Sequence, residues 1–361
     1  MNSESENIEF KERHLSKGIS QMLFPLSDDS LPFYSVKSVK QIVVKKSINL
    51  RILSPEINTR YNGKSPFGWN DGAIIPNKGL QSLISTGIYL KTKHFVVQLR
   101  PEVLLAQNLQ FQTFPENYSD RLWSVRYFFY NETDLPEKYS KIRMFYPGQS
   151  YIKFTYRSIA TGVSSENRWW GPGKTNSLLM SNSAPGFAHF FIQTEKPIKS
   201  KIGSFEFQLI AGNLRGSGEF PPDTNRTNSS VRLYSAKPLN ANRYINGLAI
   251  TYQPVFVKGL FLGIGRVFYL YEADRRNTLD GYLPVLGALL KNETHNEDQK
   301  KRDQLFSIFV KQVFDKGRSD IYIEFGRNDH AWNLRDFISD PFHSRAYIVG
   351  INKQYQLPKE S

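Results

Sequence analysis

The chain has 361 residues, no cysteine, six histidines and a formal net charge of +14. The absence of cysteine excludes a disulfide framework, a zinc knuckle and thiol catalysis, and the scattered histidines form no metal-ligand cluster, so we expect no metal and no other cofactor. Aromatic residues make up 14% of the chain, yet its mean hydropathy is −0.45. No apolar run approaches the roughly 18 residues of a transmembrane helix, which excludes that class.

The excess of Lys and Arg favours an anionic partner, such as an acidic polysaccharide or a lipid phosphate. The basic residues are spread along the chain without a helix-turn-helix, zinc-finger or RNP signature, so we expect no nucleic-acid partner. Many aromatic residues in a chain that is polar on average are typical of a transmembrane β-barrel, whose lipid-facing and lumen-facing residues alternate. A large soluble β protein is the alternative.

The N-terminal residues 1–21 are charged throughout and lack the apolar stretch of a signal peptide, so export would need a leader that this chain does not carry. We expect a helix over residues 4–22. We divide the chain into residues 1–45, an N-terminal extension with the first strand region, and residues 46–361, a barrel.

Several segments alternate apolar and polar residues with period two, which is the repeat of a β-strand. The clearest are residues 94–103, 151–160, 203–212 and 319–326. Further strands are predicted at 122–130, 246–256, 259–271, 305–314 and 345–355, with polar loops at 131–141, 216–230 and 291–303 and a short helix near 281–291.

Charged side chains on one face of so many strands indicate a wet interior, because a soluble sandwich needs an apolar inner face. At about 10 residues per tilted strand, the length supports an all-β transmembrane antiparallel barrel of about fourteen or more strands. We assign six charged residues to the lumen and expect the glutamates among them to pair with the arginines: Arg100, Glu102, Arg157, Glu206, Arg266 and Glu324.

The segment 167–187, NRWWGPGKTNSLLMSNSAPGF, carries the main motif. It is not a phosphate loop, because arginine stands where the first glycine is needed and no helix follows. In a sugar-binding interpretation, tryptophan offers a flat face and polar neighbours supply hydrogen bonds; the candidates are Arg168, Trp169, Trp170, Asn176, Ser177 and Asn182, with Asn70 and Asp71 from the similar segment 62–79. In the competing structural interpretation, which the residue types alone favour, the tryptophans anchor a loop that turns at Gly171, Pro172 and Gly173.

Glycoside hydrolysis is the enzymatic alternative, and it needs two carboxyl groups about 5 to 10 Å apart. Asp71, Glu102, Glu166 and Glu206 are available, but no short signature pairs any two of them. We therefore name no catalytic residue and expect that the protein is not an enzyme.

Residues 62–90, 99–108, 168–212 and 326–353 resemble the capsule assembly protein Wzi family in the form common in the Bacteroidetes. The most specific element is RWWGPG with the NSLLMSNSAPGF that follows it. The resemblance implies an outer-membrane β-barrel of about eighteen strands. It also implies a lectin that binds capsular or extracellular polysaccharide and helps capsule assembly and surface attachment without catalysis.

The implied setting is the cell outer membrane, with capsular or exopolysaccharide and membrane lipid or lipopolysaccharide as partners and a monomeric barrel. A polysaccharide-active enzyme and a passive porin remain the alternatives. Because the leader is missing and the chain ends in QYQLPKES rather than in a closing strand with a final aromatic residue, we expect truncation at both ends.

Overall fold

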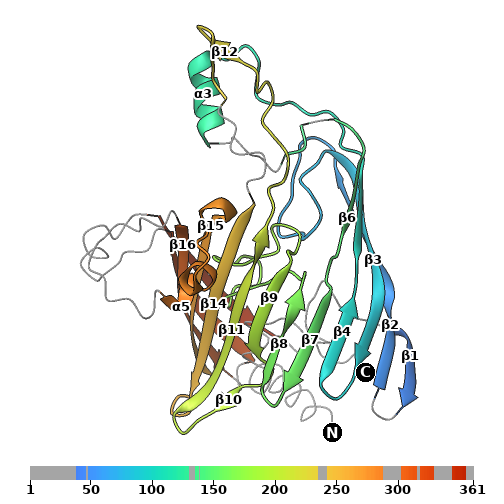
Figure 1. The fold of residues 1–361 in the computed structure, drawn as a ribbon, viewed down its shortest axis with the longest axis vertical. Coiled ribbons are helices and arrows are strands. Elements are labelled where there is room, and N and C mark those ends of the chain that lie inside the picture. Colours follow the sequence, from blue (N-terminus) through green and yellow to red (C-terminus); the bar gives the residue numbers. More distant parts are fainter. Residues whose placement is uncertain are drawn as a thin grey trace, which may run out of the picture.

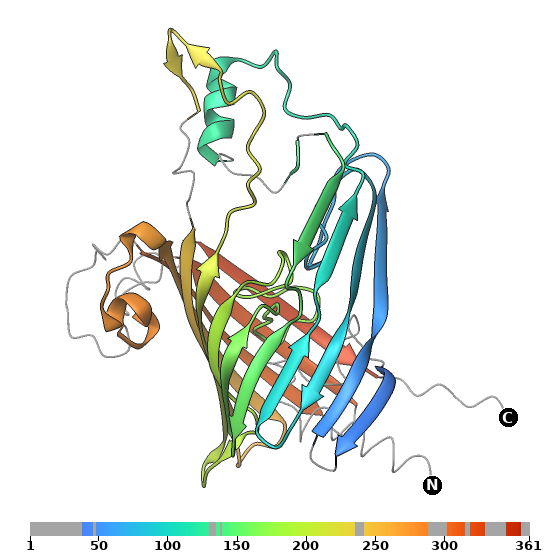
Figure 2. The ribbon, with the colours of Figure 1, turned by 45° about the vertical axis from the view of Figure 1, so that its right-hand side comes forward.

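The computed structural model describes residues 38–45, 48–129, 135–137, 139–234, 242–287, 302–314, 318–328 and 344–354. A 16-stranded antiparallel sheet dominates it and curls into a barrel-shaped wall around an interior (Figures 1 and 2). The strands are β1 (Ser38–Lys45), β2 (Ile48–Asn62), β3 (Gly79–Lys91), β4 (Phe95–Leu99), β5 (Glu102–Ala106), β6 (Ile142–Tyr146), β7 (Tyr151–Tyr156), β8 (Ile159–Ser164), β9 (His189–Thr194), β10 (Ile198–Lys199), β11 (Gly203–Leu214), β14 (Arg243–Pro254), β15 (Leu260–Tyr271), β16 (Arg302–Phe314), β17 (Ser319–Asn328) and β18 (Arg345–Lys353).

The order along the sheet is nearly sequential, from β1 to β4, then β7, β8, β9, β11 and β14 to β18. Strand β3 pairs with β4 near one end and with β5 near the other, and β6 pairs with β5. Arg100 and Pro101 separate β4 from β5. There the Arg100 backbone N–H donates to the Ser150 hydroxyl. The predicted all-β antiparallel fold is confirmed.

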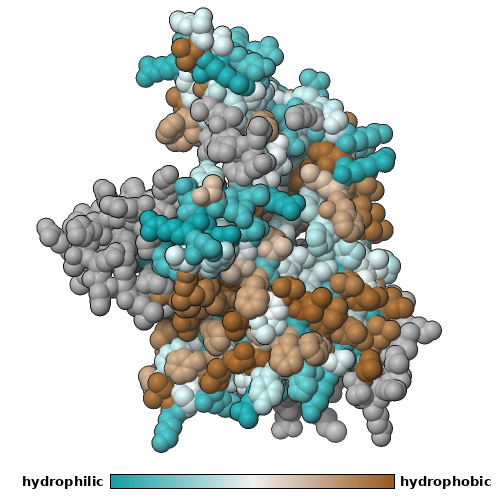
Figure 3. All heavy atoms as spheres, viewed as in Figure 1, coloured by the Kyte–Doolittle hydropathy of each residue, from teal (hydrophilic) through white to brown (hydrophobic). Residues whose placement is uncertain are grey.

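The outer face of the strands carries mainly apolar side chains, as their period-two pattern predicts, whereas the inner face carries buried polar side chains among buried apolar ones. On β7, Ile152 and Tyr156 are half exposed, at 49% and 56%, whereas Glu206 on β11 and Glu324 on β17 are fully buried. Apolar side chains gather in a broad band over the lower part of the wall in Figure 3. Such a band is typical of the lipid-facing surface of a transmembrane β-barrel; we call it the apolar belt.

The connections differ sharply between the two ends of the wall. At one end the strands are joined by short turns, such as residues 92–94, 157–158 and 255–259. At the other end lie long segments, such as residues 63–78 and 165–188. We call these the short-turn end and the long-loop end.

One predicted strand is wrong. Residues 122–130 were assigned to a strand, but the structure forms the helix α3 (Asp120–Phe129) there. Trp123 and Tyr127, four residues apart and on one helical face, are both buried. They pack with Tyr234, which follows the short two-stranded sheet of β12 (Thr227–Asn228) and β13 (Val231–Arg232), in a lobe above the wall (Figure 1).

The other expected helices have mixed outcomes. Of the helix expected near 281–291, the described part forms two single-turn helices, α4 (Leu279–Tyr282) and α5 (Pro284–Gly287), after the 3-10 turn η2 (Glu272–Asp274), and residues 288–291 lie outside the described residues. The helix expected at 4–22 lies outside the described residues. Within the described residues, no helix has the length and apolar character needed to cross a membrane.

Candidate functional site

The segment between β8 and β9, residues 165–188, folds into the interior of the curled sheet (Figure 2). We call it the plug loop. It contains the whole RWWGPG motif and the small polar residues that follow it. It packs against the inner faces of several strands, where Leu178 and Leu179 lie close to Gly326 and Gly265, and buried side chains on these faces are both apolar and polar.

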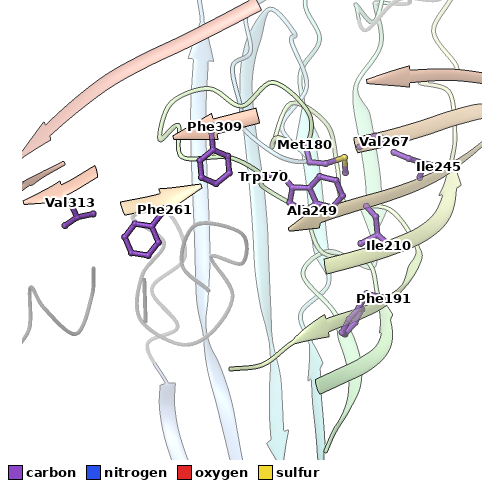
Figure 4. Close-up of a cluster of buried hydrophobic side chains, with 10 residues drawn as sticks. All are labelled: Trp170, Met180, Phe191, Ile210, Ile245, Ala249, Phe261, Val267, Phe309 and Val313. Atoms are coloured by element: carbon purple, nitrogen blue, oxygen red, sulfur yellow. The ribbon is translucent and has the colours of Figure 1, made fainter. Parts of the chain in front are cut away.

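Trp170 attaches the plug loop to the wall. Its side chain is 1% exposed and belongs to a buried apolar cluster with Met180 and Ala249 (Figure 4). The indole N–H donates to Gln208 on β11, 2.7 Å away. A Cβ at Gly247 would lie 2.6 Å from the indole ring, so only glycine allows the strand to approach it this closely. Trp170 is therefore a packing residue, as the structural interpretation of the motif expected.

The Gly-Pro-Gly corner turns the chain directly after Trp170. Gly171 has φ +99°, and a Cβ there would lie 2.6 Å from the Glu324 carboxylate. The Trp169 indole donates to the Gly173 carbonyl, 2.7 Å away, and the Ser177 hydroxyl donates to the Trp170 carbonyl. The proposed sugar ligand Ser177 thus holds the corner, and Trp169 is half-buried against it.

Arg168, proposed as a ligand for sugar, is instead buried at the base of the plug loop. Its Nε donates to Nε2 of His189, 2.9 Å away, and its guanidinium lies 3.6 Å from Glu166 and over the ring of Phe191. Burial raises the pKa of Glu166, which Arg168 opposes, and burial lowers the pKa of Arg168. This group anchors the loop and is closed to a polymer.

The segment between β2 and β3, residues 63–78, also folds inward, and it meets the plug loop. The Asn70 amide donates to the Thr175 carbonyl at 2.7 Å and accepts from the Ser183 hydroxyl at 3.0 Å, and the Gly72 N–H donates to the Asn182 carbonyl at 2.7 Å. The two stretches that the sequence marked as similar are therefore neighbours, although Asn70 and Thr175 are 105 positions apart.

Asp71 fixes the first of these two loops. Its carboxylate forms a two-pronged salt bridge with Arg60 on β2 and accepts from the backbone N–H of Trp69 at 2.6 Å. Asp71 and the Asn182 carbonyl therefore hold the two loops in place. Of the proposed sugar ligands, Asn176 is exposed. Trp69 is 57% exposed, and its indole N–H donates to the Thr175 carbonyl at 3.4 Å.

The contact between the two loops leaves a set of accessible side chains on the two segments, which connect strands at the long-loop end. We call it the ledge, and it consists of Phe67, Trp69, Asn70, Lys174, Thr175, Asn176 and Ser183. It combines an aromatic face with amides, hydroxyls and an ammonium group. Sequence reasoning did not name Trp69 as a candidate, although its position between Gly68 and Asn70, in a stretch rich in Gly, Pro and Asn, was a signal of exposure.

Two of the six predicted lumen residues lie elsewhere. Arg157 is exposed in the turn between β7 and β8, with φ +56°, and its guanidinium lies over Tyr156. Arg266 precedes the inward-facing Val267 on β15 and therefore lies on the outer face of the strand, where it donates to Gln304 at 2.7 Å. The expected pairs of these two arginines with glutamates therefore do not form.

The remaining four residues of this set are buried. Arg100 forms a salt bridge with Glu56 at 2.5 Å, and Glu102 accepts from Gln149 at 3.1 Å. Glu206 faces the interior from β11, and Glu324 lies beside Gly171 of the plug loop. No group of three or more His, Asp or Glu side chains that could hold a metal occurs among the described residues.

The sequence profile of the capsule assembly protein Wzi family matches residues 77–331. Among solved structures, the chain is similar to Wzi, described as an outer membrane protein involved in group 1 capsule assembly in Escherichia coli and a carbohydrate-binding β-barrel, with 13% identity and a TM-score of 0.48. The alignment covers 84% of this chain and 52% of that one, so the chain spans about half the length of that structure.

A porin structure is also similar, with 8% identity, a TM-score of 0.26 and coverage of 83% of this chain and 90% of the porin. No curated protein sequence matches the chain.

Proposed function

The chain belongs to the capsule assembly protein Wzi family, and on that premise we propose that it is an outer-membrane β-barrel that holds capsular or extracellular polysaccharide on the ledge without breaking it. The observation that carries the proposal is the exposed Trp69 beside the amides and hydroxyls of two inward loops. The description of the Escherichia coli relative as a carbohydrate-binding barrel involved in capsule assembly supports it.

The ledge has the chemistry that sugar recognition needs. A sugar ring presents an apolar face of C–H groups, which the indole of Trp69 can cover, and hydroxyls at its edge, which amides and hydroxyls can bond in either direction. The exposed Lys174 and Asn176 extend the same surface along the plug loop. An ammonium group beside these side chains suits a sugar that carries a carboxylate.

The loops of the ledge lack the pair of carboxyl groups of a glycoside hydrolase. The two segments 63–78 and 165–188 contain only Asp71 and Glu166. Asp71 is held by Arg60 and by the Trp69 N–H, and Glu166 is buried beside Arg168. Neither can approach a bound sugar as an acid or a base, which supports binding without turnover.

The plug loop also argues against a passive pore. Trp170 and Met180 pack against the inner face of the wall, in space that an open channel would fill with water. In barrels of this kind the short turns face the periplasm and the long loops face outward. In this orientation the ledge is reached from outside the cell, which suits retention of a surface polymer by a single monomeric barrel.

Purified capsular polysaccharide and reconstituted protein test the proposal. Wild-type protein should retain the polymer on a column without releasing new reducing ends, and Trp69→Ala should lose most of this retention. Phe256→Ala removes a comparably exposed aromatic side chain at the opposite end, 79% exposed, and should retain the polymer like wild type. New reducing ends, or equal retention by Trp69→Ala, would overturn the proposal.

A further inference from the structure

The short-turn end carries a second surface that polysaccharide binding does not use. Two neighbouring connections, residues 195–202, which include β10, and residues 255–259, lie at the lower end of the wall, and the first of them reaches lowest in Figures 1 and 2. We call them the basic tip. They are joined by the Val255 N–H, which donates to the Ile202 carbonyl at 3.1 Å, and by the Tyr252 hydroxyl, which donates to the same carbonyl at 2.8 Å.

The basic tip exposes apolar side chains where a turn in water would be polar. Val255 and Phe256 are 69% and 79% exposed, and Ile202 in the neighbouring turn is 61% exposed. They continue the apolar belt downward, because the rings of Phe205 and Tyr252 stack just above them at 4.7 Å. The hydrogen bonds within and between the turns hold these side chains in place.

Exposed lysines surround this apolar surface. They are Lys196, Lys199, Lys201 and Lys258. The only acidic residue in the two turns is Glu195, which forms a salt bridge with Lys153 on β7 at 2.8 Å. Neighbouring turns add the exposed cations Lys91, Lys93 and Arg157. The charge at this end is therefore positive beside an apolar surface.

From this arrangement we propose that the basic tip binds anionic phospholipid headgroups of the leaflet that borders the short-turn end. Phe256 and Val255 enter the boundary between headgroups and acyl chains, while the lysines extend their apolar stems along it and place their ammonium groups on lipid phosphates. Each lysine near an anionic surface strengthens such binding roughly fivefold. Arg157, which stacks on Tyr156 at the lower edge of the belt, adds to the same layer.

The absence of cysteine in the chain permits a direct test. Phe256→Cys creates a single thiol for an environment-sensitive fluorophore, and the labelled barrel is reconstituted in vesicles of phosphatidylcholine with increasing phosphatidylglycerol. The emission should shift to the blue as phosphatidylglycerol increases, and salt should weaken the shift. Emission typical of water at every lipid composition would refute insertion of the tip.

Two triple variants assign the effect to the tip. Replacing Lys196, Lys199 and Lys201 by Gln in the labelled protein should raise the phosphatidylglycerol fraction required for half of the shift by more than about tenfold, or abolish the response. Replacing the exposed Lys64, Arg121 and Lys141, which lie away from the short-turn end, by Gln removes the same charge and should leave the response unchanged. Equal effects of the two triple variants, or the same shift on adding inorganic phosphate to phosphatidylcholine vesicles, would overturn the proposal.

Discussion

Trp170→Ala tests whether the plug loop is held by packing. The side chain is 1% exposed in a cluster with Met180, Ile210 and Val267, so its truncation leaves a cavity that costs about 3–5 kcal/mol. The Gln208 side-chain oxygen also loses its indole donor, at a further cost of about 1–3 kcal/mol if nothing replaces it. The loss should be measured as a lower urea midpoint for unfolding of the reconstituted barrel, followed by its heat-modifiable mobility on gels.

Trp69→Ala is the matched control for this measurement. Trp69 is 57% exposed, so its truncation should change the unfolding free energy by no more than about 0.5 kcal/mol. We expect Trp170→Ala to lower stability and Trp69→Ala to lower polysaccharide retention. If Trp170→Ala unfolds at the wild-type midpoint, the assignment of this side chain to packing is wrong.

Three further predictions follow from individual contacts. Gly171→Ala should destabilise the barrel more than Gly218→Ala, because both glycines have positive φ but only Gly171 would place a Cβ against a carboxylate, and equal urea midpoints would contradict this. Asp71→Asn should weaken the Arg60 salt bridge, loosen the 63–78 loop and speed trypsin cleavage there, whereas an unchanged cleavage rate would show that Asp71 does not fix the loop. Burial raises the pKa of Glu137 despite the neighbouring arginine. The protonated carboxyl group therefore contributes to stability below the ordinary pKa of 4.5, and this contribution is lost as the pH rises through the pKa of the folded state. Hydrogen exchange in α3 should therefore be slowed by Glu137→Gln more at about pH 7 than at about pH 4, and a reversed order would refute the assignment.

The strands were predictable because their signal is local. Alternation places Phe205 and Phe207 outward and Glu206 inward with no knowledge of partners, and the register confirms it. The same rule failed at Arg266, because the sequence of β15 has glycines on its inner face and aliphatic or aromatic residues on both faces, so its polarity does not reveal its orientation. It failed at Arg157 because the residue lies in the turn itself.

The helix α3 was missed because aromatic residues are so dense there that both periods fit. Only the burial of Trp123 and Tyr127 against Tyr234, more than a hundred residues later, selects the helical period. The role of the tryptophans could not be predicted for the same reason, because it depends on residues far away in the sequence. Whether Trp170 meets sugar or wall depends on Gly247 and Gln208 of distant strands, and the ledge requires Asn70 to meet Thr175.

The most direct test of the central claim locates the bound polymer. Asn176→Cys on the ledge and Lys258→Cys at the short-turn end each provide the only thiol of the chain for a photoreactive label. After illumination with capsular polysaccharide and washing in denaturant, the polymer should remain attached to the Asn176→Cys protein and be absent from the Lys258→Cys protein. Attachment at Lys258→Cys alone, or equally at both positions, would contradict a binding surface on the ledge.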